Sequence, residues 1–546
     1  MSVQPEVSLH TQYDKEKKQN TAIEVVESLL SSLEDEALFK EESRLSRGLK
    51  QRHIQMLTLV GVFGTGLFLS SGSTLYLTGN VGMFLSYFIV GILVGLNQLA
   101  NIEISCLAPF TGAIVRQSEH FIDESYGFAL GWIQVYSNVI PVELAATAVV
   151  MQYWSDLNPA VWLTVFMVII VAFNSYSIGF YGEVEFVFGV LKLLLITGLI
   201  LFCAIVDLGG AHNIDRIGFR YWKETPFKAK YLVGSLGKFL AWWKAANSTI
   251  YAFGGISVIS LFGGETQNPR RAICTAGKRV FYRVFSLYML TVFGLTLILS
   301  SEDAAIASPT GDATGSPFVI AIKRVGVKGL PSVVNALVLS SAFSAANLAL
   351  VQSSRNLFAL ASKGQAPKIF LKTNKKGLPY YGVIISGIFM PLSYMSASSG
   401  SAEVFSWFQS ITSANILVGW ISISLAHIGM QRALRAQGFS RDDLPYKMPF
   451  AHVGAYILLL FFTLFLFTSG FPNFMKGGFV ISSFFSCYFT IAFFVILFVA
   501  WKLFKRTKII PPQDVDLKSL FRQIEETPEL PAQPLTGWKW LTLLWS

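Results

Sequence analysis

The chain has 546 residues, of which 53% are hydrophobic and only 14% are charged. Soluble globular domains carry about a quarter charged residues, so this composition excludes an ordinary soluble protein and indicates a membrane protein. The formal net charge of +10 therefore bears first on membrane orientation, and no nucleic-acid partner is expected.

In chain order, a polar segment comes first and a series of apolar runs follows. Residues 1–53 contain no apolar run typical of a signal peptide, and we expect a mostly disordered cytoplasmic tail. Residues 54–503 contain twelve apolar runs of spanning length, which predict an all-α polytopic membrane protein with twelve transmembrane helices. The runs cover 54–77, 81–104, 126–153, 160–179, 184–208, 239–262, 280–300, 331–361, 379–398, 404–428, 451–470 and 478–503.

The distribution of Lys and Arg predicts that both termini lie in the cytoplasm. If the N-terminus is inside, the loops 71–80, 154–160 and 398–403 are outside and contain neither residue. The loops on the other side are densely basic, which is the bias of cytoplasmic loops. The expected outside loop 209–238 is basic too, but long loops orient a protein less reliably. Residues 504–546 are expected to be a cytoplasmic tail whose tryptophans touch the membrane surface.

The first and sixth spans are both interrupted by glycine. The stretch 61-GVFGTGLF-68 has three glycines in six residues, and 253-FGGIS-257 repeats the pattern five spans later. Each glycine disfavours a regular helix by about 1 kcal/mol relative to alanine. One explanation is close packing of helices, which small residues permit. We favour the other, in which interrupted helices at corresponding positions of two repeats form the substrate site of a transporter.

Interrupted helices would expose backbone groups at membrane depth. Amide N–H groups are freed at the start of the following half-helix and carbonyls at the end of the preceding one, and these suit a carboxylate and an ammonium respectively. The expected ligand is therefore an amino acid. The candidate substrate-binding residues are Phe63, Gly64, Thr65, Gly66, Phe253, Gly254, Gly255 and Ser257.

Charged residues inside spans are further candidates, because one costs about 2.5–3.5 kcal/mol at the membrane centre. Lys192 lies midway along the fifth span and is the first candidate for proton coupling, beside the hydroxyls of Ser340, Ser341 and Ser344 on the eighth span. The alternative is a permanently charged lysine with a structural role.

Acidic residues mark the second, third and fifth spans. Glu143, well inside the third span, is expected either to relay a proton or to bond Ser or Tyr neighbours, and both remain open. Glu103 ends the second span and is expected to be a gate or an ion-pair partner near the cytoplasmic face. Glu185 shares a helix face with Lys192 at a distance of two turns, so we expect it to cap the helix at the membrane interface.

No enzyme site or metal site is apparent. The glycine-rich segments lack the GK[ST] of a phosphate loop, and the six histidines and four cysteines are dispersed. Without an ATP site, uphill transport would use an ion gradient. No cofactor is therefore expected, and the proton gradient is the expected energy source.

A set of segments resembles one known family when taken together and in order. They are 47-RGLKQRHIQML-57, GTGLF at 64–68, 121-FIDESYGFALGW-132, 182-GEVEF-186 with Lys192, 263-GGETQNPRR-271, 353-SSRNLFALASKGQAP-367 and 440-SRDDLPYK-447. The chain resembles the fungal amino acid permease branch of the amino acid–polyamine–organocation (APC) superfamily. The matching segments extend from Arg47 to about Arg506.

The resemblance implies a core of two inverted five-helix repeats with discontinuous helices 1 and 6, followed by two trailing helices. The repeats would cover about 54–208 and 239–428, and helices 11 and 12 about 451–503. It also implies proton symport of amino acids by alternating access at the plasma membrane. The tails are candidate sites for trafficking or ubiquitination machinery.

The sixth span departs from the family pattern. Where relatives usually read Gly-Thr-Glu-Leu, this chain reads Gly255-Ile256-Ser257-Val258 and lacks the acid. The loss favours a neutral or otherwise non-basic amino acid over a polyamine or other organocation. A transport-deficient amino acid sensor on the same fold is the second alternative, and the N-terminal tail of about fifty residues favours the permease, since such sensors tend to have a longer one.

Overall fold

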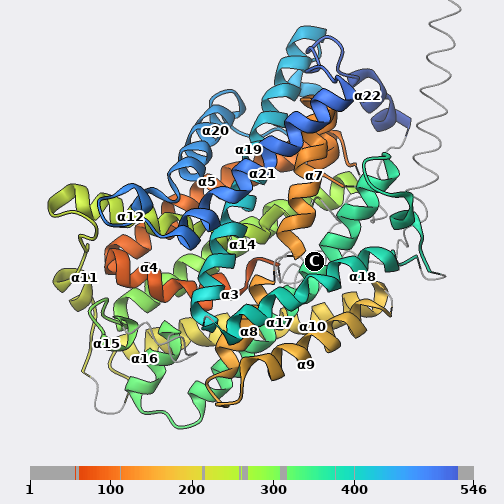
Figure 1. Ribbon diagram of the computed structural model, residues 1–546. Helices are drawn as coiled ribbons and strands as arrows, with labels where there is room; N and C mark the ends of the chain where they lie inside the picture. The colour runs from red at the N-terminus through yellow and green to blue at the C-terminus, as the bar shows by residue number, and fades with distance from the viewer. Residues whose placement is uncertain are drawn as a thin grey trace, which may run out of the picture. The chain divides into compact units, whose positions relative to one another are not determined.

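The computed structural model describes residues 56, 61–110, 112–139, 141–176, 178–211, 215–257, 260, 269–307, 316–374, 377–398 and 400–526. The chain divides into two units, Met1–Ser46 and Arg47–Ser546, and the residues described belong to the second. The expectations for 1–53, for 527–546 and for most of 263–271 lie outside this set. Within it, the regular secondary structure is helical (Figure 1).

Eight predicted spans coincide with helices long and apolar enough to cross a membrane. One of the eight is interrupted: Pro141 separates α7 (Glu124–Val139) from α8 (Val142–Met151), and proline has no amide hydrogen with which to continue a helix. The others are α5 (Asn80–Leu107), α10 (Ile178–Asp207), α14 (Pro269–Ile298), α17 (Leu330–Ser362), α19 (Ser401–Gln437), α20 (Ala451–Thr468) and α21 (Ile481–Lys505).

The other four predicted spans are short or interrupted in the described residues. The fourth is α9 (Pro159–Asn174), of 16 residues. The ninth divides into α18 (Tyr380–Ile388) and the 3-10 helix η4 (Met390–Ala397), which contains Pro391. The first and sixth are divided at their glycines and are described below.

Shorter helices lie at the two ends of the helical bundle. Figure 1 shows α11 (Arg220–Glu224), α15 (Ala304–Ala307) and α16 (Pro317–Val325) gathered at one end, far from α22 (Leu517–Glu526). The remaining short elements are α6 (Ile114–Phe121) and the 3-10 helices η3 (Lys368–Leu371), η5 (Arg441–Asp443) and η6 (Phe471–Phe474).

Close packing of α5 against α14 depends on glycine. A Cβ atom on Gly91 would lie 2.7 Å from the ring of Phe285, and one on Gly95 would lie 2.2 Å from the ring of Phe281. Both distances are shorter than a van der Waals contact, so each glycine makes room for an aromatic ring of the facing helix. Helices packed in this way surround the interrupted first and sixth spans.

Candidate functional site

The first predicted span is interrupted at Phe63–Gly64. Gly64 adopts an extended conformation, with φ −125° and ψ −162°, and α3 (Thr65–Phe68) begins at the next residue. After Leu69 the helix resumes as α4 (Ser70–Thr78). The break predicted from the glycines of this span is therefore present.

The sixth predicted span is interrupted in a similar way. Helix α12 (Gly234–Ala252) ends before Phe253, and the 3-10 helix η1 (Gly254–Ser257) follows. The two interruptions touch: a Cβ atom on Gly255 would lie 2.0 Å from the carbonyl oxygen of Gly61, and one on Gly66 would lie 2.6 Å from Cα of Ala252. These glycines therefore serve close helix packing as well as the breaks, so the two explanations of the pattern are compatible.

A tyrosine hydroxyl joins the carbonyls that the two breaks expose. The hydroxyl oxygen of Tyr288, on α14, lies 2.7 Å from the carbonyl oxygen of Val62 and 2.8 Å from that of Ala252. In addition, Ser341 Oγ on α17 donates to the carbonyl of Phe63 at 2.9 Å. Backbone polar groups at membrane depth must find hydrogen-bond partners within the protein, and Tyr288 and Ser341 are the partners of these three carbonyls.

A cavity of about 170 Å³ lies beside the breaks. Gly61 from the first span and Tyr251, Gly254 and Gly255 from the sixth line it, together with Glu143 from α8. A second chamber of about 120 Å³ adjoins it. Residues that line both are Gln134, Ser137, Gly254, Gln352 and Ile416.

Glu143 accepts two hydrogen bonds at the wall of the cavity. Tyr251 donates to Oε1 at 2.7 Å and Thr65 donates to Oε2 at 2.9 Å, and the two hydroxyl oxygens lie 2.9 Å apart. The carboxylate thus connects the half-helix after the first break to the helix before the second. The expected bond between Glu143 and a Tyr neighbour is present, and a proton relay through Glu143 stays a prediction.

The other predicted binding residues lie in different surroundings. Phe63 and Phe253 are fully buried and pack edge-on or tilted against Tyr288, with ring centroids 5.3 and 4.8 Å away, and neither lines the cavity. Gly64 lies near Glu143, since a Cβ atom there would be 3.7 Å from Oε1. Ser257 lines the second chamber, and its Oγ has no hydrogen-bond partner among the described residues.

Lys192 is buried within a cluster of charges. Its side chain interacts electrostatically with Glu185 and Glu143, while Ser344 donates to Glu185 at 2.5 Å and Asn347 donates to it at 2.7 Å. The prediction that Glu185 caps its helix at the membrane interface is wrong, because this side chain is fully buried and bound to α17. The sequence of α10 alone does not show that polar groups of the facing helix α17 bind this carboxylate.

The three hydroxyls expected beside Lys192 each donate a hydrogen bond to another group. Ser344 donates to Glu185, Ser341 donates to the carbonyl of Phe63, and Ser340 donates to the carbonyl of Leu337 on its own helix at 2.7 Å.

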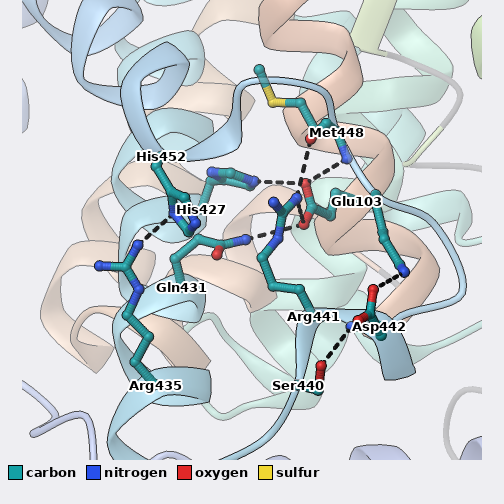
Figure 2. Close-up of polar contacts among 10 residues, drawn as sticks. Glu103, His427, Gln431, Arg435, Ser440, Arg441, Asp442, Met448 and His452 are labelled. Atoms are coloured by element: carbon teal, nitrogen blue, oxygen red, sulfur yellow. Dashed lines mark hydrogen bonds and ion pairs between the residues drawn. The ribbon is translucent and has the colours of Figure 1, made fainter.

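Glu103 is the centre of a polar network at the end of α5. Figure 2 shows side chains from α19 and from the segment after it converging on its carboxylate. His427 Nε2 lies 3.0 Å from Oε2, and the amide N–H of Met448 donates to the same oxygen at 2.9 Å. Oε1 accepts from Gln431 at 3.0 Å and forms an ion pair with Arg441 at 2.9 Å.

Several residues of these sites were not singled out from the sequence. His427 had a detectable signal, because an ionisable residue inside a span is uncommon. Tyr288 had none, because nothing in the sequence distinguishes it among 19 tyrosines. The amides Gln134 and Gln352, which line both chambers, also carry no local motif.

The sequence matches the amino acid permease family over residues 53–510. It is 37% identical over 500 residues to the dicarboxylic amino acid permease of Saccharomyces cerevisiae, covering 90% of this chain and 82% of that protein. It is 35% identical to a proline-specific permease of Emericella nidulans, covering 86% and 88%. The lysine-specific permease of Saccharomyces cerevisiae is 32% identical, with 94% and 88% covered.

The match extends over nearly all the described helices and includes both interrupted spans. Three observations point to the same family. They are the cavity beside the interruptions, the eight helices long and apolar enough to cross a membrane, and the extent of the sequence match. The chain therefore belongs to the amino acid permease family and is a membrane transporter, not an enzyme.

Proposed function

We propose that this protein imports amino acids across the plasma membrane by proton symport, with the substrate held in the cavity between the first and sixth spans. The observation that supports the proposal is that both interrupted spans line one cavity, the first through Gly61 and the sixth through Gly254 and Gly255 of the 3-10 helix η1. Irregular backbone at membrane depth is tolerated where it lines a cavity and is typical of transporter binding sites.

The lining of the two chambers favours an uncharged amino acid. Among the described residues that line them, Glu143 is the one charged side chain, and both of its oxygens already accept hydrogen bonds. No described Lys or Arg lines either chamber to pair with an acidic side chain. The dicarboxylic, proline-specific and lysine-specific relatives are similar in identity, so identity does not choose among their substrates.

The buried charges next to the cavity support the coupling part of the proposal. Lys192 interacts electrostatically with Glu143, which lines the cavity, and with Glu185, which is bound to α17. A buried lysine between two acids can exchange a proton as its surroundings change. Lys192, Glu143 and Glu185 are the residues that we assign to coupling, and Glu103 is assigned to gating.

The orientation and the helix count belong to the same proposal. We infer twelve spans in two inverted repeats of five, with two further helices, by adding the four other predicted spans to the eight that are long and apolar enough to cross a membrane. The Lys and Arg distribution supports cytoplasmic termini. In this orientation the ends of α5 and α19 near Glu103 and α22 face the cytoplasm, and α11, α15 and α16 lie outside. The tails are the proposed sites for trafficking or ubiquitination machinery.

An uptake panel of radiolabelled amino acids in a permease-deficient host tests the proposal. We expect uptake of uncharged amino acids that increases at acidic external pH and is lost in Lys192→Met. The matched control is Lys238→Met, which removes an exposed lysine of α12. Specific binding with no uptake of any amino acid would contradict transport and favour the receptor alternative. Uptake that does not depend on pH would contradict proton coupling.

A second substitution tests the substrate class. Ser257→Glu introduces the acid that the family pattern implies at this position and places it in the wall of the second chamber. We expect uptake of lysine or arginine to appear and uptake of uncharged amino acids to fall. An unchanged substrate range would show that position 257 does not face the substrate.

A further inference from the structure

Residues 507–526 form a segment that follows the last span and includes α22, and we call it the C-terminal strap. It is packed into the protein through apolar side chains: Val515, Leu517 and Leu520 are at most 4% exposed, and Phe521 stacks on Phe439 with ring centroids 4.7 Å apart. A segment that buries this much apolar surface is an ordered part of the transporter.

The strap binds the end of α6 and the residues that follow it. The amide of Ile510 donates to the carbonyl of Ile122 at 3.0 Å, and the ring Nε2 of His120 lies 3.2 Å from the carbonyl of Asp516, to which it donates. Just beyond α6, Asp123 accepts from Thr507 at 2.8 Å and forms an ion pair with Lys502 at the end of α21. The ion-paired carboxylate of Asp123 is 1% exposed.

The strap also binds the end of α19. The side-chain amide nitrogen of Gln437 lies 3.0 Å from the carbonyl of Pro512, 3.3 Å from that of Gln513 and 2.7 Å from that of Val515. One segment thus holds the C-terminal ends of α6 and α19 together. A cavity of about 320 Å³ lies among these two helices, α20 and the strap.

Both helices that the strap holds are walls of the second chamber. Ile114 and Val115 of α6 line it on one side, and Trp420 and Ile423 of α19 line it on another. Helix α6 follows two residues in the left-handed region, Gly112 with φ +89° and Ala113 with φ +43°. Alanine is strained in that region, and such strain is typical of segments that change conformation.

We propose that the C-terminal strap is an intramolecular latch that holds α6 against α19 and thereby restrains the opening of the second chamber to the cytoplasm. The latch acts on the chamber from outside, because none of the residues that line the chamber belongs to 507–526. The side of the membrane rests on the orientation proposed above, and the latch itself does not depend on which amino acid is carried.

The test measures access to the chamber with a cysteine reporter at Ile114→Cys in the full-length protein. Inside-out membrane vesicles are treated with a membrane-impermeant thiol reagent, without any amino acid. The parent protein, whose cysteines are Cys106, Cys203, Cys274 and Cys487, gives the background. Combining the reporter with Leu520→Asp, which places a charge in the buried face of α22, should increase the labelling rate about tenfold.

The matched control is Lys518→Ala, which changes an exposed residue of the same helix and should leave the rate unchanged. If the Leu520→Asp protein does not reach the membrane, Gln437→Ala is used in its place and should also increase the labelling rate. This substitution removes the contacts to three strap carbonyls and keeps the apolar face of α22 intact. Labelling at or below the rate of the reporter alone in the folded variant would overturn the proposal. The labelling assay does not require transport. A result that contradicts the latch therefore leaves the proposed substrate class untouched, and the reverse also holds.

Discussion

The hydroxyl of Tyr251 donates a hydrogen bond of 2.7 Å to Glu143, 108 residues earlier in the chain. This bond joins the helix that ends at the second interruption to the helix that begins after Pro141. Since Thr65 donates to the same carboxylate, the half-helix after the first interruption is held at the same place. The two breaks and the third span are therefore coupled through one carboxylate in the cavity wall.

We expect Tyr251→Phe to lower amino acid uptake about tenfold or more. The change removes one hydroxyl and leaves the ring, so the buried carboxylate of Glu143 loses a hydrogen bond. Such a bond to a charged group contributes about 1.5–3 kcal/mol, and each 1.4 kcal/mol corresponds to a factor of ten. Initial uptake rates, normalised to the protein at the cell surface, measure the effect. Tyr394→Phe is the control, since its hydroxyl contacts Thr164 at an exposed position. Equal uptake in both variants would show that the Tyr251–Glu143 bond has no role in transport.

Gly255→Ala should abolish transport and destabilise the protein. The added methyl group would lie 2.0 Å from the carbonyl oxygen of Gly61, and backbone atoms cannot yield as a flexible side chain can. Forcing extra volume into a packed site costs about 1–3 kcal/mol. The midpoint of thermal unfolding in detergent and the uptake rate both check this prediction.

Gly198→Ala is the control for that substitution. A Cβ atom on Gly198 meets no atom within 4 Å, and alanine favours a helix over glycine by about 1 kcal/mol, so this variant should be at least as stable as the parent. A Gly255→Ala protein that transports normally would mean that the two breaks separate more easily than their contact suggests.

The sequence predicted where the first and sixth spans break but not what holds the breaks. Glycine spacing is a local signal, and it located Gly64 and Gly255 correctly within their spans. The partners come from distant helices: Tyr288 reaches both breaks from α14, and no periodicity within α14 shows which way one tyrosine faces.

The expectation for Glu185 failed for a related reason. Its position at the start of an apolar run suggested a helix cap at the interface, but the burial of a charge depends on the polar groups of the facing helix. Ser344 and Asn347 on α17 supply these groups. The sequence places Ser344 of the eighth span beside Lys192, but no pattern in that span shows that its hydroxyl donates to Glu185.

Arg441→Ala should destabilise the protein and alter gating more than the loss of a surface ion pair would. Glu103 is fully buried, and Arg441 is the arginine that neutralises its carboxylate. Removing one partner of a fully buried ion pair lowers the free energy of unfolding by about 3–5 kcal/mol. Arg441 is only half-buried, and Gln431 and Met448 still donate to Glu103 in the variant, so we expect a smaller loss of about 2 kcal/mol.

The control for Arg441→Ala is Lys447→Ala, which removes a neighbouring ion pair with Asp442. That pair is exposed on both sides, and exposed pairs contribute about 0–1 kcal/mol. Thermal unfolding in detergent should therefore separate the two variants clearly. Similar unfolding midpoints would mean that His427, Gln431 and Met448 hold Glu103 without the arginine.

Glu119 provides a prediction for the pH dependence of stability. Its side chain, on α6, packs over Gly127 and accepts a hydrogen bond of 2.6 Å from Gln365. Burial raises the pKa of this carboxyl above its ordinary value, and the charges of Arg116 and Lys363 and the Gln365 bond offset only part of that rise. Glu124 is the nearby acid that adds to it.

Because the pKa of Glu119 is higher in the folded protein than in the unfolded chain, the folded protein binds more protons between the two values. The contribution of Glu119 to the stability of the folded protein is therefore present at low pH, and it is lost as the pH rises from the unfolded-state pKa through the folded-state pKa. We expect Glu119→Gln, which cannot ionise, to gain in unfolding midpoint relative to the parent as pH rises from about 4, and the difference to level off once the pH exceeds the raised pKa of the folded protein. Glu525→Gln, at an exposed position of α22, is the control for the loss of one carboxyl group. A gain for Glu119→Gln that shrinks with rising pH would mean that the arginine and lysine outweigh burial and hold the carboxylate charged.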